Sequence, residues 1–185
     1  MIHARQSNQV ILVLGGCRSG KSAHALTLAD GIGGEQKIFV ATSRPRDQEM
    51  RARIARHQEV RGPDWQTEEC PLHLSESIKR NRPQADVVLI DCLTLWVSNL
   101  LEQQTDEAYV FDSVHHLLKA LDEQGCPLLM VSNETGTGTV PENRLARLFR
   151  DINGHVNQQM AARADTVIWM VAGIPVFIKG GPDER

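Results

Sequence analysis

The stretch QVILVLGGCRSGKS, Gln9 to Ser22, decides the fold class of this 185-residue chain. Its first half is a continuous apolar run rich in branched residues, which is typical of a strand covered on both faces. Gly15, Gly20, Lys21 and Ser22 then match G-x-x-x-x-G-K-[ST], a loop whose backbone N–H groups surround phosphate oxygens. A helix that follows directly adds the positive potential of its N-terminus. The stretch therefore predicts a nucleoside triphosphate site between a buried strand and a helix.

Apolar runs of the same kind recur along the chain and alternate with helical patterns. Strands are expected at Gln9–Leu14, Lys37–Thr42, Asp86–Asp91, Pro127–Ser132 and Thr166–Val171, and Ile174–Lys179 is expected to return as an antiparallel edge hairpin. Apolar spacing predicts helices over Lys21–Ala29, Pro45–Arg61, Glu107–Asp122 and Glu142–Ala164, the last with Pro141 near its first turn. Gly31–Gly34 and Thr135–Thr139 are expected as loops. This alternation predicts an α/β fold with a doubly wound, mostly parallel sheet.

Composition limits the class of protein. The chain is 41% hydrophobic and 23% charged, with a net charge of −3, which offers no basis for a nucleic-acid partner. It contains no apolar run long enough to span a membrane and no secretory signal, so we expect a cytoplasmic protein. The four cysteines show no paired spacing and are expected as free thiols. We expect one catalytic domain over residues 9–185, preceded by a flexible extension over residues 1–8.

An acidic residue suited to organise Mg²⁺ follows a second strand. Asp91 ends the apolar run DVVLID, the position at which an aspartate completes the magnesium site of phosphate-loop enzymes together with the hydroxyl of Ser22. The alternative is that Asp91 only caps the helix that follows. A guanine-specifying N-K-x-D motif is absent, which disfavours a switch GTPase.

A charged segment, RPRDQEMRARIARHQEVRGPDWQTEE from Arg44 to Glu69, carries a candidate nucleophile and ends in a loop with a tryptophan. On a helix, His57 shares a stripe with Met50, Ile54 and Arg61. Neighbouring arginines disfavour protonation of its imidazole, and a neutral imidazole is able to attack phosphorus. The alternative is a solvated surface histidine, and spacing alone favours that reading.

Together these residues resemble the family of bifunctional adenosylcobinamide kinase/adenosylcobinamide-phosphate guanylyltransferases of the late cobalamin pathway. The resemblance extends from about Gln9 to Lys179 and rests on four blocks, which are GGCRSGKS (Gly15–Ser22), VATSRPRDQEMRARIARHQEVRGPDWQTEE (Val40–Glu69), LIDCLTLWVSNLL (Leu89–Leu101) and VSNETGTGTVPENRLARLFRDINGHVNQQMA (Val131–Ala161). The first block is shared by many NTPases, whereas the second and fourth are more specific. The resemblance implies a P-loop NTPase fold of the RecA-like class.

The resemblance also implies two reactions and their site residues. Adenosylcobinamide is phosphorylated with GTP or ATP, and GMP then passes from GTP to that phosphate through a covalent GMP-histidine. The histidine carries over to His57, and Lys21 serves the kinase step. Nucleotide contacts carry over to Gly15, Gly16, Cys17, Arg18, Ser19, Gly20, Lys21, Ser22, Ala41, Thr42, Ser43, Gln58, Glu59, Val60, Arg61, Glu69 and Asp91. The family further implies a homo-oligomer, specifically a trimer.

Several alternatives stay open at this stage. Another small-molecule P-loop kinase needs no histidine nucleophile, and a RecA-like regulatory ATPase hydrolyses nucleotide without cobinamide. A member that keeps only guanylyltransferase activity is disfavoured by the intact Lys21 and Ser22. Asp91 and Glu134 are both candidates for the base of the kinase step, and Glu134 is equally a loop cap. The sequence does not locate the pocket for the corrinoid, because a large ligand leaves no motif.

Overall fold

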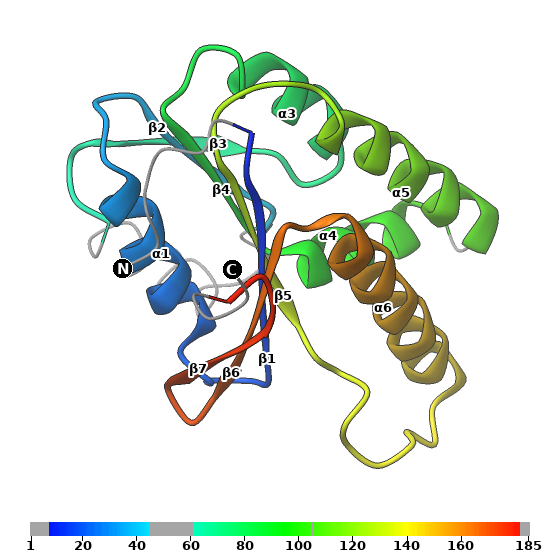
Figure 1. The fold of residues 1–185 in the computed structure, drawn as a ribbon. Helices are drawn as coiled ribbons and strands as arrows, with labels where there is room; N and C mark the ends of the chain where they lie inside the picture. Colours follow the sequence, from blue (N-terminus) through cyan, green and yellow to red (C-terminus); the bar gives the residue numbers. More distant parts are fainter. Residues whose placement is uncertain (1–7, 45–60, 105, 182–185) are drawn as a thin grey trace.

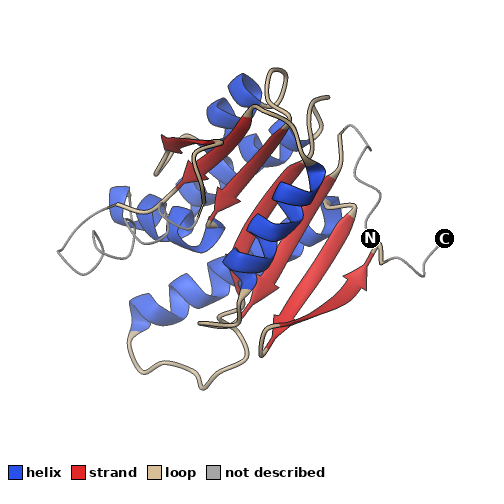
Figure 2. Cartoon of the chain, turned by 90° about the vertical axis from the view of Figure 1, so that its left-hand side faces the viewer, coloured by secondary structure: helices blue, strands red, loops and turns tan. Residues whose placement is uncertain are grey.

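The computed structural model describes residues 8–44, 61–104 and 106–181. Its central feature is a seven-stranded sheet in the order β3-β2-β4-β5-β1-β6-β7 (Figures 1 and 2). The strands are β1 (Val10–Gly15), β2 (Lys37–Ala41), β3 (Trp65–Glu69), β4 (Val87–Asp91), β5 (Leu128–Asn133), β6 (Thr166–Val171) and β7 (Ile174–Lys179). All neighbours pair in parallel except β6 and β7, which form the antiparallel edge hairpin that the sequence predicts.

The described helices cover the two faces of the sheet unequally. They are α1 (Lys21–Ile32), α3 (Leu74–Asn81), α4 (Leu93–Gln103), α5 (Glu107–Leu121) and α6 (Arg144–Arg163). On one face, α1 packs through Ala25 and Ala29 against apolar residues of β1, β2, β4 and β5. The other described helices bury a larger cluster on the opposite face (Figure 1). Side chains of each central strand therefore alternate between two apolar layers, which explains their continuous apolar sequence.

Three expectations from sequence are wrong in detail. The tryptophan-bearing segment forms the edge strand β3, because Trp65 is buried against Phe39 and its indole N–H donates to Asp30 at 3.1 Å. α1 continues to Ile32, so Gly31 belongs to the helix and the turn begins at Gly33. α6 begins only at Arg144, because the side chain of Asn143 caps it by accepting from the Ala146 N–H.

Two helices that periodicity missed are α3 and α4. α3 has only 8 residues, which is too short for a clear apolar stripe. α4 is apolar on most of its surface because it is enclosed between the sheet, α5 and α6, so it lacks a polar face. Of the predicted helix over Pro45–Arg61, only Arg61 is among the described residues, and it lies in a turn.

The buried side chain of Arg82 contacts the segment that leads into β1. Arg82 is only 2% exposed and donates hydrogen bonds to the carbonyls of Cys126, Leu121 and Glu123. It also donates to Asn8 Oδ1 at 2.8 Å. Asn8 is the one described residue of the expected extension over residues 1–8. Burial lowers the pKa of the Arg82 guanidinium, and its carbonyl partners compensate for lost hydration.

Candidate functional site

The phosphate loop connects the carboxyl end of β1 to the first turn of α1, as expected. Two residues with positive φ form its curve, Arg18 at 55° and Gly20 at 89°. Gly20 is the N-cap residue of α1. Because glycine has no side chain, the N–H groups of the first turn receive no side-chain cap. The Nζ of Lys21 donates to Gly16 O at 3.0 Å, across the curve of the loop. A curved loop at a helix N-terminus with a lysine in the first turn is an arrangement that can bind an anion.

The tip of the β6–β7 hairpin supports this loop from the side. The N–H of Gly173 donates to Ser19 O at 3.1 Å, and Gly15 pairs in register with Met170 of β6. A Cβ on Gly15 would come within 2.4 Å of Ser19 Oγ and 2.9 Å of Met170 O. The neighbouring strand and Ser19 therefore leave no room for a larger residue at position 15.

Asp91 lies at the same edge of the sheet, at the carboxyl end of β4. The Asp91–Cys92 peptide bond is cis. The Thr42 hydroxyl donates to Cys92 O and accepts from Cys92 N–H, both at 2.8 Å. Asn99 of α4 donates to Thr42 O at 2.8 Å. The expected contact residue Thr42 is fully buried, so its side chain holds the ends of β2 and β4 together beside Asp91.

Of the remaining expected residues near β2 and β3, Arg61 has the clearest environment. Its guanidinium lies 3.6 Å from the centre of the Phe39 ring and donates to Thr67 Oγ1 at 3.4 Å. Burial lowers the Arg61 pKa, while the negative charge of Asp91 raises it. This arginine therefore lies across β2 and β3, over Phe39 and against Thr67. Glu69 is exposed at the end of β3, paired in register with Ala41.

The structure places part of the expected site and leaves another part undescribed. The phosphate loop, Ala41, Thr42, Ser43, Glu69 and Asp91 all lie at the carboxyl ends of β1, β2, β3 and β4. His57, Gln58, Glu59 and Val60 lie outside the described residues. Ligands bind at this edge in open parallel sheets, because loops from several strands converge there.

The segment after β5 completes this edge, and α4 and α6 add side chains there that sequence reasoning missed. Glu134 donates its backbone N–H to Gly15 O at 3.0 Å, and its carboxylate accepts from Gly136 N–H at 2.7 Å. The contact with Gly136 N–H is the loop cap, one of the two roles expected for Glu134 from the sequence. Buried polar side chains from α4 and α6 surround Ser132 and Asn133, and these are Thr94, Asn153 and Asn157. Their signal in the sequence was weak, because polar residues inside a helical stripe resemble surface positions.

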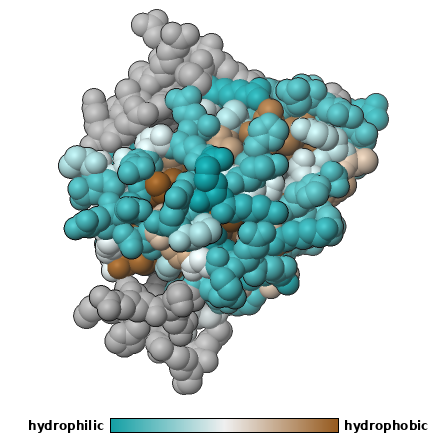
Figure 3. Space-filling model, turned by 90° about the horizontal axis from the view of Figure 1, so that it is seen from above, coloured by the Kyte–Doolittle hydropathy of each residue, from teal (hydrophilic) through white to brown (hydrophobic). Residues whose placement is uncertain are grey.

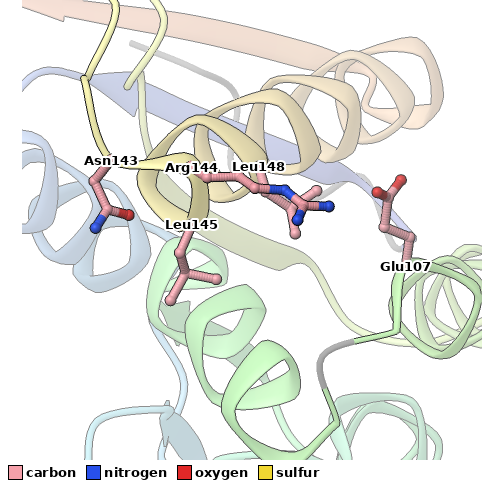
Figure 4. Close-up of a pocket in the computed structure, with 5 residues that line it drawn as sticks. All are labelled: Glu107, Asn143, Arg144, Leu145 and Leu148. Carbon is pink, nitrogen blue, oxygen red and sulfur yellow. The ribbon is translucent and has the colours of Figure 1, made fainter.

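A separate hollow of about 440 Å³ lies at the N-terminal ends of α5 and α6 (Figure 4). It is lined by Glu107, Asn143, Arg144, Leu145 and Leu148. Leu145 is 55% exposed, although the sequence places it on the apolar stripe of α6. The buried part of that stripe is Ile152, Val156 and Met160. The hollow shares no residue with the phosphate-loop edge.

Comparison with known proteins agrees with the resemblance seen in the sequence. The family model described as cobinamide kinase / cobinamide phosphate guanyltransferase matches residues 11–178. The chain belongs to this family. The bifunctional adenosylcobalamin biosynthesis protein CobU of Salmonella typhimurium is 43% identical over 182 residues, covering 92% of this chain and 99% of that protein. The corresponding protein CobP of Pseudomonas aeruginosa is 40% identical over 172 residues, covering 92% and 98%.

A solved structure of lower sequence identity supports the fold alone. The flagellar accessory protein FlaH of Methanocaldococcus jannaschii superposes with a TM-score of 0.55 at 13% identity, covering 94% of this chain and 79% of that protein. This cobinamide kinase / guanyltransferase family member thus has the P-loop NTPase-like sheet expected from its sequence. Among the described residues, no helix is long and apolar enough to cross a membrane.

Proposed function

We propose that this chain catalyses both reactions of its family: phosphorylation of adenosylcobinamide with GTP or ATP, and transfer of GMP from GTP to the resulting phosphate through a GMP-His57 intermediate. One observation carries the proposal. The family match covers residues 11–178, and within it an intact phosphate loop lies at the same sheet edge as Asp91. We further propose that residues 9–185 form one catalytic domain, located in the cytoplasm.

In the kinase step, the chain binds and orients the triphosphate. The phosphate-loop N–H groups hold the β- and γ-phosphates, and Lys21 leaves Gly16 O to contact them. Ser22 and Asp91 are the residues that would hold Mg²⁺, which neutralises charge on the transferring phosphoryl group. Among the described residues there is no cluster of three or more acidic, histidine or cysteine side chains for a metal. Mg²⁺ generally takes few protein ligands and several from phosphates and water.

In the guanylyl step, His57 serves as the nucleophile. One imidazole nitrogen forms a bond to the α-phosphorus of GTP, and the bond to the β-phosphate oxygen breaks, releasing pyrophosphate. An oxygen of cobinamide phosphate then attacks the same phosphorus, and the P–N bond breaks to return the imidazole. Dividing one displacement into two through a covalent intermediate is the usual advantage of nucleophilic catalysis. Arg61 lies four residues after His57, and the charge of Asp91 acts on its guanidinium, which supports a role in holding phosphates.

The test is to incubate the protein with GTP labelled on its α-phosphate and Mg²⁺, with and without adenosylcobinamide. The protein should acquire a label that is labile in acid and stable in base. A His57→Asn variant should take up no label and keep kinase activity, whereas Lys21→Ala should lose kinase activity. Label on the His57→Asn variant would contradict the assignment, and absence of label on the wild type would favour another small-molecule P-loop kinase.

We also propose that the chain forms a homo-oligomer, a trimer. The hairpin of β6 and β7 supports an interface between copies of the chain, because Trp169, Val171, Ile174, Val176 and Ile178 are each 39–65% exposed. The number of three copies rests on the family resemblance. Thr166–Ile178 contains no charged residue, although exposed edge strands usually carry charges that block further pairing. The surface seen from above Figure 1 is mostly hydrophilic by contrast (Figure 3). Exposed contiguous apolar residues commonly mark an interface.

A further inference from the structure

Asn133 lies beside the phosphate loop on the face of the sheet that carries it. β5 runs between β4 and β1, and Asn133 pairs in register with Gly15, two residues beyond the partner of Asp91. Leu129 and Val131 belong to the apolar layer under α1. Because side chains alternate along a strand, the side chain of Asn133 projects on that same α1 face. It therefore lies between the strand that ends in Asp91 and the loop that carries Lys21.

The backbone of Asn133 is held from three sides. Its N–H donates to Thr94 Oγ1 at 2.6 Å, from the first turn of α4. Its carbonyl accepts from Asn153 Nδ2 at 2.9 Å and from Asn157 Nδ2 at 3.0 Å, both on α6. The next residue, Glu134, donates its N–H to Gly15 O. Contacts from α4, α6 and β1 thus fix the position from which the Asn133 side chain projects.

The side chain itself is not satisfied in the same way. Asn133 Oδ1 is buried and has no hydrogen-bond partner among the described residues. The other buried side-chain atoms of this kind in the described part of the chain are Ser19 Oγ, His24 Nε2 and Asn153 Oδ1. Ser19 is in the phosphate loop, His24 is one turn into α1, and Asn153 supports Asn133, so all of them lie around the same edge. A buried polar atom without a partner destabilises the free protein, and a substrate toward which the Asn133 side chain turns would supply the missing partner.

We propose that the Asn133 amide contacts the reacting groups of the phosphoryl transfer. Its Oδ1 accepts a hydrogen bond from the attacking hydroxyl of the acceptor substrate, and its Nδ2 donates one to an oxygen of the γ-phosphate. The hydroxyl oxygen bonds to the γ-phosphorus, and the bond to the bridging oxygen breaks, leaving its electron pair on the nucleoside diphosphate. The hydroxyl proton passes to a γ-phosphate oxygen and then to solvent, since an amide does not accept it. A side-chain amide orients the nucleophile in this way in other phosphoryl-transfer enzymes.

The proposal rests on the proposed kinase activity. It gives Asn133 the role of orienting the hydroxyl, which differs from the role of a base considered for Asp91 and Glu134. The Glu134 carboxylate caps its own loop. The proposal gives Asn133 no role in the attack of His57 on the α-phosphorus, because it places the Asn133 amide at the γ-phosphate. The two half-reactions of one enzyme therefore provide an internal comparison.

The experiment measures both half-reactions and thermal unfolding for Asn133→Ala and Asn133→Asp, with Asn143→Ala as the matched control. Asn133→Ala should lower kinase kcat about 100-fold, the usual loss for one transition-state hydrogen-bond donor, while GMP labelling keeps its wild-type rate. Its Tm should not fall below that of the wild type, because an unsatisfied acceptor is removed. Asn133→Asp should be at least as slow and raise the KM for the nucleotide, since a carboxylate repels the γ-phosphate.

The control Asn143→Ala removes an amide from the cap of α6 and should lower Tm with kcat unchanged. Wild-type kinase kcat in Asn133→Ala overturns this proposal and leaves the proposed function intact. Equal loss of both half-reactions, or loss together with a lower Tm, also overturns it, because that pattern indicates a structural role. A wild-type protein that makes no cobinamide phosphate overturns the proposed function and this inference together.

Discussion

Substitution of Gly15 by alanine tests whether the phosphate loop is shaped by its contact with β6. The added Cβ would lie 2.4 Å from Ser19 Oγ and 2.9 Å from Met170 O. Ordinary van der Waals contact begins near 3.4 Å, so the two neighbours must retreat by about 1.0 Å and 0.5 Å. Ser19 Oγ has no hydrogen-bond partner among the described residues and can rotate, whereas Met170 O belongs to the backbone of the paired strand β6 and does not move freely.

Overpacking of this kind costs about 1–3 kcal/mol. For a chain of this length, each kcal/mol lowers Tm by roughly 2–4 °C, so Gly15→Ala should unfold about 2–12 °C below the wild type. Because the strain falls on the loop that holds the phosphates, the Kd for GTP should also rise. The assays are thermal unfolding followed by circular dichroism and calorimetric titration with GTP.

Gly154→Ala is the matched control for this substitution. Gly154 lies inside α6, and a Cβ there meets no atom within 4 Å. Alanine favours a helix interior by about 1 kcal/mol over glycine, so this variant should unfold at a slightly higher temperature. A Gly15→Ala variant with the Tm and GTP affinity of the wild type would refute the reasoning about β6.

Two further predictions concern the surface and the thiols. Val176→Lys places a charge on the apolar hairpin and should reduce the mass measured by sedimentation. The control Val140→Lys, on the exposed β5–α6 loop, should leave the mass unchanged. An unchanged mass for Val176→Lys would argue against the hairpin as the interface. At pH 8 a maleimide should label the exposed Cys17 first and Cys92 hardly at all, because burial raises the pKa of the Cys92 thiol to about 12. GTP should slow the labelling of Cys17, and mass spectrometry that finds Cys92 labelled as rapidly as Cys17 would contradict this expectation.

The apolar layers explain which parts of the fold were predictable. β1, β2, β4 and β5 have apolar runs because both of their faces are buried, whereas β6 has an apolar run although Trp169 and Val171 are exposed. Each of these strands was expected close to its observed bounds. β3 escaped prediction because an edge strand with the sequence WQTEE has one buried residue, and that burial depends on Phe39 and Asp30 from distant elements. α4 escaped because enclosure on most sides removes the amphipathic pattern.

The same distinction applies to the candidate site. The phosphate loop and Asp91 were predictable because phosphate binding requires glycines, a lysine and a hydroxyl at fixed spacing. Asn133 was not, since its significance depends on a register with Gly15 and on contacts from Thr94, Asn153 and Asn157. Thr94 lies 39 positions before Asn133, and Asn153 and Asn157 lie 20 and 24 positions after it, so these contacts cannot be read from neighbouring residues.

By itself, the sequence determined the chemistry available to this protein: a phosphate loop, an aspartate after a buried strand, and a candidate histidine nucleophile within a family pattern. Local backbone requirements and the alternation of buried strands with helices are encoded by neighbouring residues, so they are readable in order. The tertiary structure alone decided that Thr42 holds Asp91's strand, that Gly173 supports Ser19, and that an unsatisfied amide faces the phosphate loop. Such contacts arise only when distant segments pack, because burial and strand register then determine which polar atoms find partners.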